Sequence, residues 1–82
     1  MIKVLFFAGY RERLGCDALE LNTDATTIAA LKAQLAERGD LWRQLLQDRK
    51  THTAINLAIV TDPAAEIQSG DEVAFFPPVT GG

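Results

Sequence analysis

The sequence is poor in cysteine, in positive charge and in long apolar runs. Its one cysteine, Cys16, cannot form an internal disulfide, and its one histidine, His52, cannot complete a metal site with that thiol. A lone thiol of this kind fits the reducing cytoplasm, where we expect the protein to work. We therefore expect neither a disulfide framework nor a metal centre.

Positive charge is too sparse to bind a phosphate backbone. Eight lysines and arginines stand against eleven aspartates and glutamates, and no basic run exceeds the pair Arg49-Lys50. Binding to nucleic acid needs clustered positive charge, so nucleic acid is not an expected partner. No window approaches the ~18 apolar residues of a membrane span. The apolar start of the chain is interrupted at Arg11 without a signal-peptide cleavage site, which also argues against a membrane or secreted protein.

The chain length limits what the protein can do alone. Eighty-two residues suffice for one domain, and a hydrophobic fraction of 48% with 23% charged residues is typical of a folded one. A chain of this size buries only ~60% of its unfolded surface, enough for one sheet and one or two helices but not for a deep pocket. We therefore expect its chemistry to be shared with another chain.

The apolar pattern predicts the element order ββαββ. Strands are expected at residues 2–8, 17–21, 53–60 and 72–76, with room for one more short strand near residues 66–67. One helical turn is expected at residues 11–14, ended by Gly15.

The long helix is expected at residues 27–38, between the two pairs of strands. Thr26 or Asp24 would cap its start, and Gly39 would end it. Asp40 would cap a second, short helix that carries Trp42, and Trp42 is expected in the core. This order predicts an α+β fold: a mixed sheet of four to five strands, with one long helix across one face and a second short helix.

Charged residues assign the two faces of that sheet. Lys3 and Glu72 must point away from the core, and the strand alternation then sends their neighbours at every second position to the same side. The core would take Ile2, Val4, Phe6, Val73 and Phe75, and the opposite face would present Leu5, Phe7 and Phe76. Two interpretations stay open: these three residues form a docking patch, or residues 11–14 or the second helix cover them.

The last six residues follow the final strand as a tail, so we divide the chain into a domain of residues 1–76 and an extended segment of residues 77–82. Pro77 and Pro78 favour an extended course, and six residues at ~3.3 Å each reach roughly 20 Å. Gly81 and Gly82 lack Cβ atoms and fit a narrow slot. The segment is either a frayed end or a carrier whose terminal carboxylate, on Gly82, is the reacting group. That carboxylate needs activation, for instance by conversion to a mixed anhydride with AMP. The chain has no phosphate-binding Gly-Lys loop, so another protein must carry out the activation.

Three stretches of the sequence carry a family resemblance: residues 7–15 (FAGYRERLG), the pair Ile55-Asn56, and above all residues 70–82 (GDEVAFFPPVTGG). Along its whole length the chain resembles the small subunits of molybdopterin synthase, which are sulfur carriers with the ubiquitin-like β-grasp fold. A Gly-Gly end is shared with other sulfur carriers, whereas the run Phe-Phe-Pro-Pro-Val is typical of this family. The chain departs from the family at Leu57, where a polar residue commonly follows the asparagine, and at Gly9-Tyr10.

The resemblance implies a cycle of sulfur transfer in which the chain is a co-substrate and not a catalyst on its own. An ATP-dependent adenylating enzyme would convert Gly82 into a transient acyl adenylate, and a sulfur donor enzyme would turn the adenylate into a C-terminal thiocarboxylate. The tail would then enter the large subunit, in a heterotetramer of two large and two small subunits, and give its sulfur to cyclic pyranopterin monophosphate to build the molybdopterin dithiolene. The chain itself would bind no cofactor.

The resemblance also assigns roles to individual residues. Gly82 would carry the reacting atom, Gly81 would allow its entry, and the spacer would be Pro77, Pro78, Val79 and Thr80. The interface with the partner would include Phe7 and Phe76, which strand alternation also predicts, and Ile59, which comes from the resemblance alone. Strand alternation adds Leu5 to this interface.

Two other functions stay open: a carrier of the same fold for thiamine or tRNA thiolation, and a ubiquitin-like modifier or interaction module whose Gly-Gly end forms an amide with lysine. Among the remaining reactive residues, Cys16 is expected to be a small core or edge residue rather than a sulfur relay, and His52 a solvated turn residue.

Overall fold

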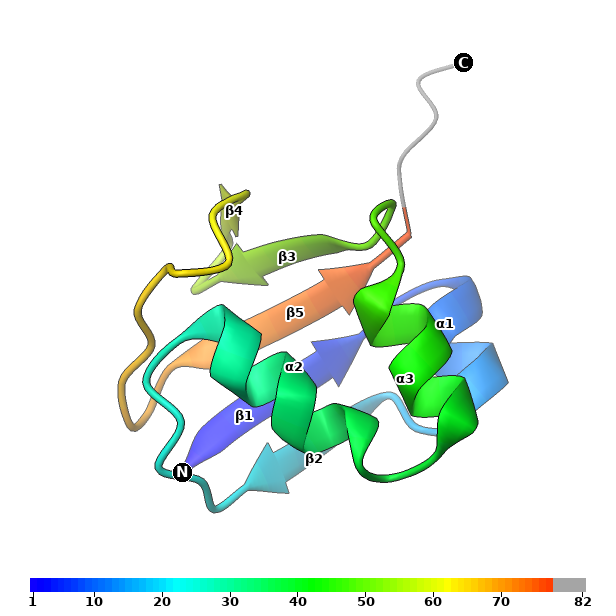
Figure 1. The fold of residues 1–82 in the computed structure, drawn as a ribbon, viewed down its shortest axis with the longest axis horizontal. Coiled ribbons are helices and arrows are strands. Elements are labelled where there is room, and N and C mark those ends of the chain that lie inside the picture. The colour runs from blue at the N-terminus through cyan, green and yellow to red at the C-terminus, as the bar shows by residue number, and fades with distance from the viewer. Residues whose placement is uncertain (78–82) are drawn as a thin grey trace.

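The computed structural model describes residues 1–77, which form a sheet with helices packed on one side (Figure 1). The calls on Pro78, Val79, Thr80, Gly81 and Gly82 lie outside the described residues. Within residues 1–77 there are five strands and three helices, in the order β1 (Ile2–Phe6), α1 (Gly9–Leu14), β2 (Ala18–Leu21), α2 (Ile28–Ala36), α3 (Asp40–Gln47), β3 (His52–Ile55), β4 (Ala58–Val60) and β5 (Glu72–Phe76).

The sheet places the first and last strands side by side at its centre. The strand order is β2-β1-β5-β3-β4; β1 and β5 run parallel, and the other neighbours are antiparallel. This confirms the predicted α+β class and the mixed sheet. Because Phe6 pairs with Phe75, the ends of both central strands lie at the same edge of the sheet.

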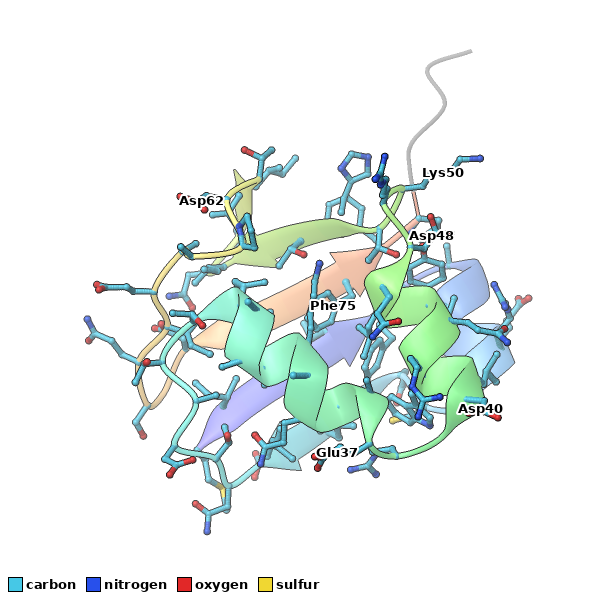
Figure 2. All side chains as sticks on the ribbon, in the orientation of Figure 1. Glu37, Asp40, Asp48, Lys50, Asp62 and Phe75 are labelled. Atoms are coloured by element: carbon cyan, nitrogen blue, oxygen red, sulfur yellow. The ribbon has the colours of Figure 1, made fainter. Side chains whose placement is uncertain are left out.

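The core lies between the sheet and the helices. All five residues predicted for it, Ile2, Val4, Phe6, Val73 and Phe75, are fully buried. The helices supply the other half of the core through Tyr10, Ile28, Leu31, Leu35, Leu45 and Leu46. Figure 2 shows Phe75 between α2 and α3. Trp42 is half-buried at the margin, with its ring edge-on to Phe6 at a centroid distance of 5.4 Å.

The caps predicted for both helices were wrong. Thr27, not Thr26 or Asp24, caps α2, and its hydroxyl oxygen accepts a hydrogen bond from the Ala30 amide at 3.2 Å. Gly39, not Asp40, is the cap of α3, and Gly39 does not end α2, which stops at Ala36. Asp40 is the first helical residue and forms an ion pair with Arg43 at 2.8 Å instead.

The predicted strand at residues 53–60 is two strands, β3 and β4, which form an antiparallel hairpin. The reversal occurs at Asn56 and Leu57, which have φ values of 50° and 73°. An apolar residue in the second turn position kept the pattern looking continuous, so the sequence concealed the turn. The predicted extra strand near residues 66–67 is a single bridge between Glu66 and Thr27.

The remaining elements agree with the pattern in type, but β1 ends at Phe6, two residues before the predicted end of the first strand. The turn at residues 11–14 is part of α1, and Gly15 ends it in a left-handed conformation at φ 66°. β2 pairs with β1 as an antiparallel strand. Among the helices of residues 1–77, none has the length and hydropathy needed to cross a bilayer.

Candidate docking surface

The face of the sheet that points away from the helices is not covered by any helix of residues 1–77; we call it the bare face. Tyr10 of α1 and Leu45 and Leu46 of α3 belong to the core cluster, so these two helices pack on the covered side. The interpretation that these helices cover Leu5, Phe7 and Phe76 is therefore wrong: Phe7 is exposed, and Leu5 and Phe76 are half-buried. The strand register assigns to the bare face Lys3, Leu5, Ala18, Glu20, His52, Ala54, Ile59, Glu72, Ala74 and Phe76.

An apolar row crosses all five strands in the middle of the bare face. Leu5 pairs with Ala18 on one side and with Ala74 on the other, Ala74 pairs with Ala54, and Ala54 pairs with Ile59. The three alanines project no further than a methyl group, whereas Ile59 at the edge is 66% exposed. A partner can therefore approach the central strands closely, with Leu5 and Ile59 available for apolar contact.

Aromatic side chains occupy the end of the bare face at which β5 stops. Phe76 is half-buried and pairs with His52, whose ring stacks on it at a centroid distance of 5.5 Å. Phe7 follows β1 at the same end, donates its amide hydrogen to the Phe75 carbonyl at 3.2 Å, and is 46% exposed. Pro77 continues directly from Phe76, so the chain leaves the sheet beside this group (Figure 1).

The prediction for His52 was wrong. It is not a turn residue but the first residue of β3, exposed and stacked on Phe76. The polar residues around it concealed the start of the strand, and only the long-range pairing of β3 with β5 brings the two rings together.

Ala8 directs Phe7 and Tyr10 to opposite sides. It has φ 55° and ψ −134°, a conformation that costs an alanine free energy and that glycine adopts more readily. The sharp change of direction leaves Phe7 exposed, whereas Tyr10 is buried and its hydroxyl lies 2.7 Å from the Thr51 hydroxyl. Backbone strain of this kind concentrates at functional sites, and here it directly follows an exposed phenylalanine.

Charged side chains occupy the opposite end of the bare face. Lys3 pairs with Glu20 on one neighbouring strand and with Glu72 on the other. Opposite charges directly across strands are favourable, and the two glutamates leave this end with net negative charge. The bare face is therefore graded from an aromatic end, through an apolar row, to an acidic end.

A hydrogen-bonded cluster fixes the β3–β4 turn at the acidic end. The Asn56 side-chain nitrogen Nδ2 donates to Asp71 Oδ1 at 3.0 Å, and the Asn56 side-chain oxygen accepts from the Glu72 backbone amide at 2.9 Å. The Gln68 amide donates to Asp71 Oδ2 at 2.8 Å. The Asn56 side chain, followed by the Gln68 backbone amide, lowers the pKa of the Asp71 carboxyl below its ordinary value, because both bonds favour the ionised form. The hairpin is thereby tied to the start of β5.

The covered side also has a surface depression, between α2, α3 and the outer strands. This groove has a volume of about 560 Å³ and mixes charges of both signs from Lys32, Asp48, Arg49 and Asp62. Lys32 is half-buried, with its Nζ 5.9 Å from the centre of the Phe75 ring, and burial lowers its pKa. Because the charges do not converge on one position, the groove shows no reactive arrangement.

The remaining reactive side chains form no second site. Cys16 is half-buried against the core cluster, with its Sγ 3.4 Å from the Ala18 carbonyl oxygen, which agrees with the expected edge position. Within residues 1–77, no three histidine, cysteine or acidic side chains come close enough to hold a metal ion. Of the predicted site residues that the structure describes, Leu5, Ile59 and Phe76 share the bare face, with Phe7 and Pro77 at its aromatic end.

Known proteins are similar to this chain in sequence and in fold. The profile of the ThiS family matches residues 4–82. Two relatives called molybdopterin synthase sulfur carrier subunit, from Haemophilus influenzae and Escherichia coli, are 46% and 49% identical to the chain over 82 residues, with both proteins covered in full. A structure of the complex of subunits 1 and 2 of the molybdopterin-converting factor from Helicobacter pylori matches with a TM-score of 0.71 and 22% identity, over 99% of this chain and 97% of that one. The ubiquitin-like β-grasp fold is confirmed.

Proposed function

Because the chain belongs to the ThiS family, we propose that it is the sulfur carrier subunit of a molybdopterin synthase. The observation that carries the proposal is the full-length identity of 46% and 49% with two relatives of that name. The structure supports it with a bare face whose aromatic end adjoins the start of the tail at Pro77.

The reacting group in this proposal is the carboxylate of Gly82. An ATP-dependent adenylating enzyme joins a carboxylate oxygen to the α-phosphate of ATP and releases pyrophosphate. Sulfur at the oxidation level of sulfide, supplied by a donor enzyme, then displaces AMP and leaves a thiocarboxylate. A thioacid is ionised at neutral pH, and its soft sulfur is a better nucleophile than the carboxylate oxygen that it replaces.

Sulfur transfer then takes place in the large subunit. The thiocarboxylate sulfur attacks a carbon of cyclic pyranopterin monophosphate and displaces an oxygen substituent from it, which forms a thioester. Hydrolysis of the thioester leaves the sulfur on the pterin and returns Gly82 to a carboxylate. A dithiolene needs two sulfur atoms, so two loaded carriers are consumed for each product. An assembly of two large and two small subunits suits this requirement. The lone thiol Cys16 is consistent with a cytoplasmic setting.

The folded body of the chain positions the tail. Docking of the bare face holds the start of the tail against the large subunit, with contacts from Phe7, Phe76, Leu5 and Ile59. Residues 77–80, Pro77, Pro78, Val79 and Thr80, then serve as a spacer, and Gly81 lets the tip pass a narrow entrance because it has no side chain. The full segment of residues 77–82 spans roughly 20 Å when extended.

Intact mass spectrometry tests the proposal. We expect the chain, co-expressed with an adenylating enzyme and a sulfur donor, to gain the mass difference between one oxygen and one sulfur. A variant without Gly82 should fold normally but show no gain, and it should not support molybdopterin formation with the large subunit.

Absence of the sulfur adduct, together with failure to bind the large subunit, would contradict the proposal. Co-purification with the partners of thiamine or tRNA thiolation, or isopeptide-linked products on lysine, would point to the two alternative functions.

A further inference from the structure

Leu57 combines two features that are rarely found together. It is 90% exposed, more than any other large apolar side chain of residues 1–77, and it has φ 73°. A tight hairpin turn with positive φ at both central residues favours the sequence Asn-Gly. Asn56 satisfies that preference, but a leucine in the second position meets steric conflict between its Cβ and the following carbonyl. The Leu57 side chain thus does not stabilise the isolated fold, because it is not buried and it strains the turn.

The turn that carries Leu57 is held firmly. The Asn56 side chain is hydrogen-bonded to Asp71 and to the Glu72 backbone amide. The Asn56 backbone amide also donates to the Glu72 carbonyl at 2.8 Å. Because the backbone of this turn is already fixed, binding a partner there costs little further ordering of the backbone, which favours tight association.

Leu57 also lies near the apolar row of the bare face. It lies two residues before Ile59, the outermost member of that row, in the same hairpin. The five residues of β5 separate the turn from the tail exit by about 17 Å at 3.3–3.4 Å per residue. A standard interface covers ~800 Å² on each partner, a footprint on the order of 30 Å across, and so accommodates both ends of the face.

We propose that Leu57 is an anchor residue that inserts into an apolar pocket of the large synthase subunit and helps to select that partner. The inference rests on the proposed function. The large subunit is the occupant we commit to, because interfaces of assembled subunits are more apolar than those of transient complexes. A fully exposed leucine suits the assembled complex better than a passing encounter with the adenylating enzyme.

The test compares two substitutions in the full-length chain, by calorimetric titration against the purified large subunit and by thermal unfolding. Leu57→Asn removes the apolar side chain and relaxes the turn, since asparagine tolerates positive φ. We expect it to raise the unfolding midpoint by about 4–8 °C, yet to weaken binding about 10- to 100-fold. Leu41→Gln, a change at an exposed leucine of α3 outside the bare face, is the matched control and should bind like the wild type.

The outcomes separate this inference from the proposed function. If the wild type binds the large subunit and Leu57→Asn binds within twofold of it, the anchor role is wrong and the proposed function stands. If Leu57→Asn and Leu41→Gln weaken binding equally, the anchor role is also wrong. Failure of the wild type to bind the large subunit would instead contradict the proposed function.

Discussion

The covered and bare faces of the sheet are made by the same strands, yet their chemistry differs. The covered face carries large aliphatic and aromatic side chains that pack against three helices. The bare face carries alanines in the middle, aromatic rings at one end and charges at the other. Strand alternation thus separates the core that stabilises the domain, on one side, from the docking surface that we propose, on the other.

The strand register connects these two properties. A slip of one residue between β1 and β5 would turn one of the two strands over and place either Lys3 or Glu72 in the core. The parallel pairing of Phe6 with Phe75 therefore fixes the core, and it also brings Phe7 and Phe76 to the aromatic end. In each pair of adjacent phenylalanines, the first therefore packs in the core and the second lies at the aromatic end.

The largest expected effect is on the covered face. Phe6 is 1% exposed, lies edge-on to Trp42 and stacks on Phe75 at a centroid distance of 6.0 Å. We expect Phe6→Ala to lower the free energy of unfolding by about 3–5 kcal/mol, because it removes buried area and leaves a cavity. Urea denaturation followed by tryptophan fluorescence measures the change. A loss below about 1 kcal/mol would show that the covered face is not the stabilising one.

The next effect should fall on binding and leave the fold almost unchanged. Phe7 is the immediate neighbour of Phe6, but it is 46% exposed on the other side. We expect Phe7→Ala to reduce the free energy of unfolding by less than about 1 kcal/mol and to weaken binding to the large subunit about tenfold or more. Measuring both unfolding and binding for Phe6→Ala and for Phe7→Ala makes each variant the control for the other. Equal losses of stability in Phe6→Ala and Phe7→Ala would remove the distinction between the faces.

The sequence was sufficient to distinguish these faces because two charged residues sit in otherwise apolar strands. Lys3 and Glu72 each exclude one orientation, so alternation alone assigned the core correctly. The helix starts were harder, because Thr26 and Thr27 are the same residue type and local sequence cannot choose between adjacent caps. The turn at Asn56-Leu57 was missed because a leucine is an unusual residue at a position with positive φ, and in the sequence it looks like part of a continuous strand.

Other features of the docking surface depend on contacts distant in sequence. The stacking of His52 on Phe76 and the apolar row from Ala18 to Ile59 follow from the strand order, which no local pattern specifies. The prediction that Ile59 belongs to the interface came from the family resemblance and not from the local sequence pattern. The roles of Gly81 and Gly82 stay predictions.

The smallest effect should come from the cluster that braces the acidic end of the bare face. Hydrogen bonds from Asn56 and Gln68 lower the pKa of Asp71 below 3.8, its ordinary value. Because the folded state binds this proton less tightly than the unfolded state, the stabilisation is complete well above pH 3.8 and is lost as the pH falls through that value and below. In Asp71→Asn the side chain keeps its shape but cannot ionise. We therefore expect the wild type to be the more stable at neutral pH, and the difference to shrink between about pH 5 and pH 3.

Thermal unfolding of both proteins across this pH range measures the effect, and salt identifies its cause. Charge-pair interactions weaken in about 0.5 M sodium chloride, whereas short hydrogen bonds to a carboxylate are much less screened. The pH dependence of the difference should therefore persist in salt. If the two proteins lose stability in parallel as the pH falls, Asp71 does not brace the hairpin, and the acidic end of the bare face owes its rigidity to the core beneath it.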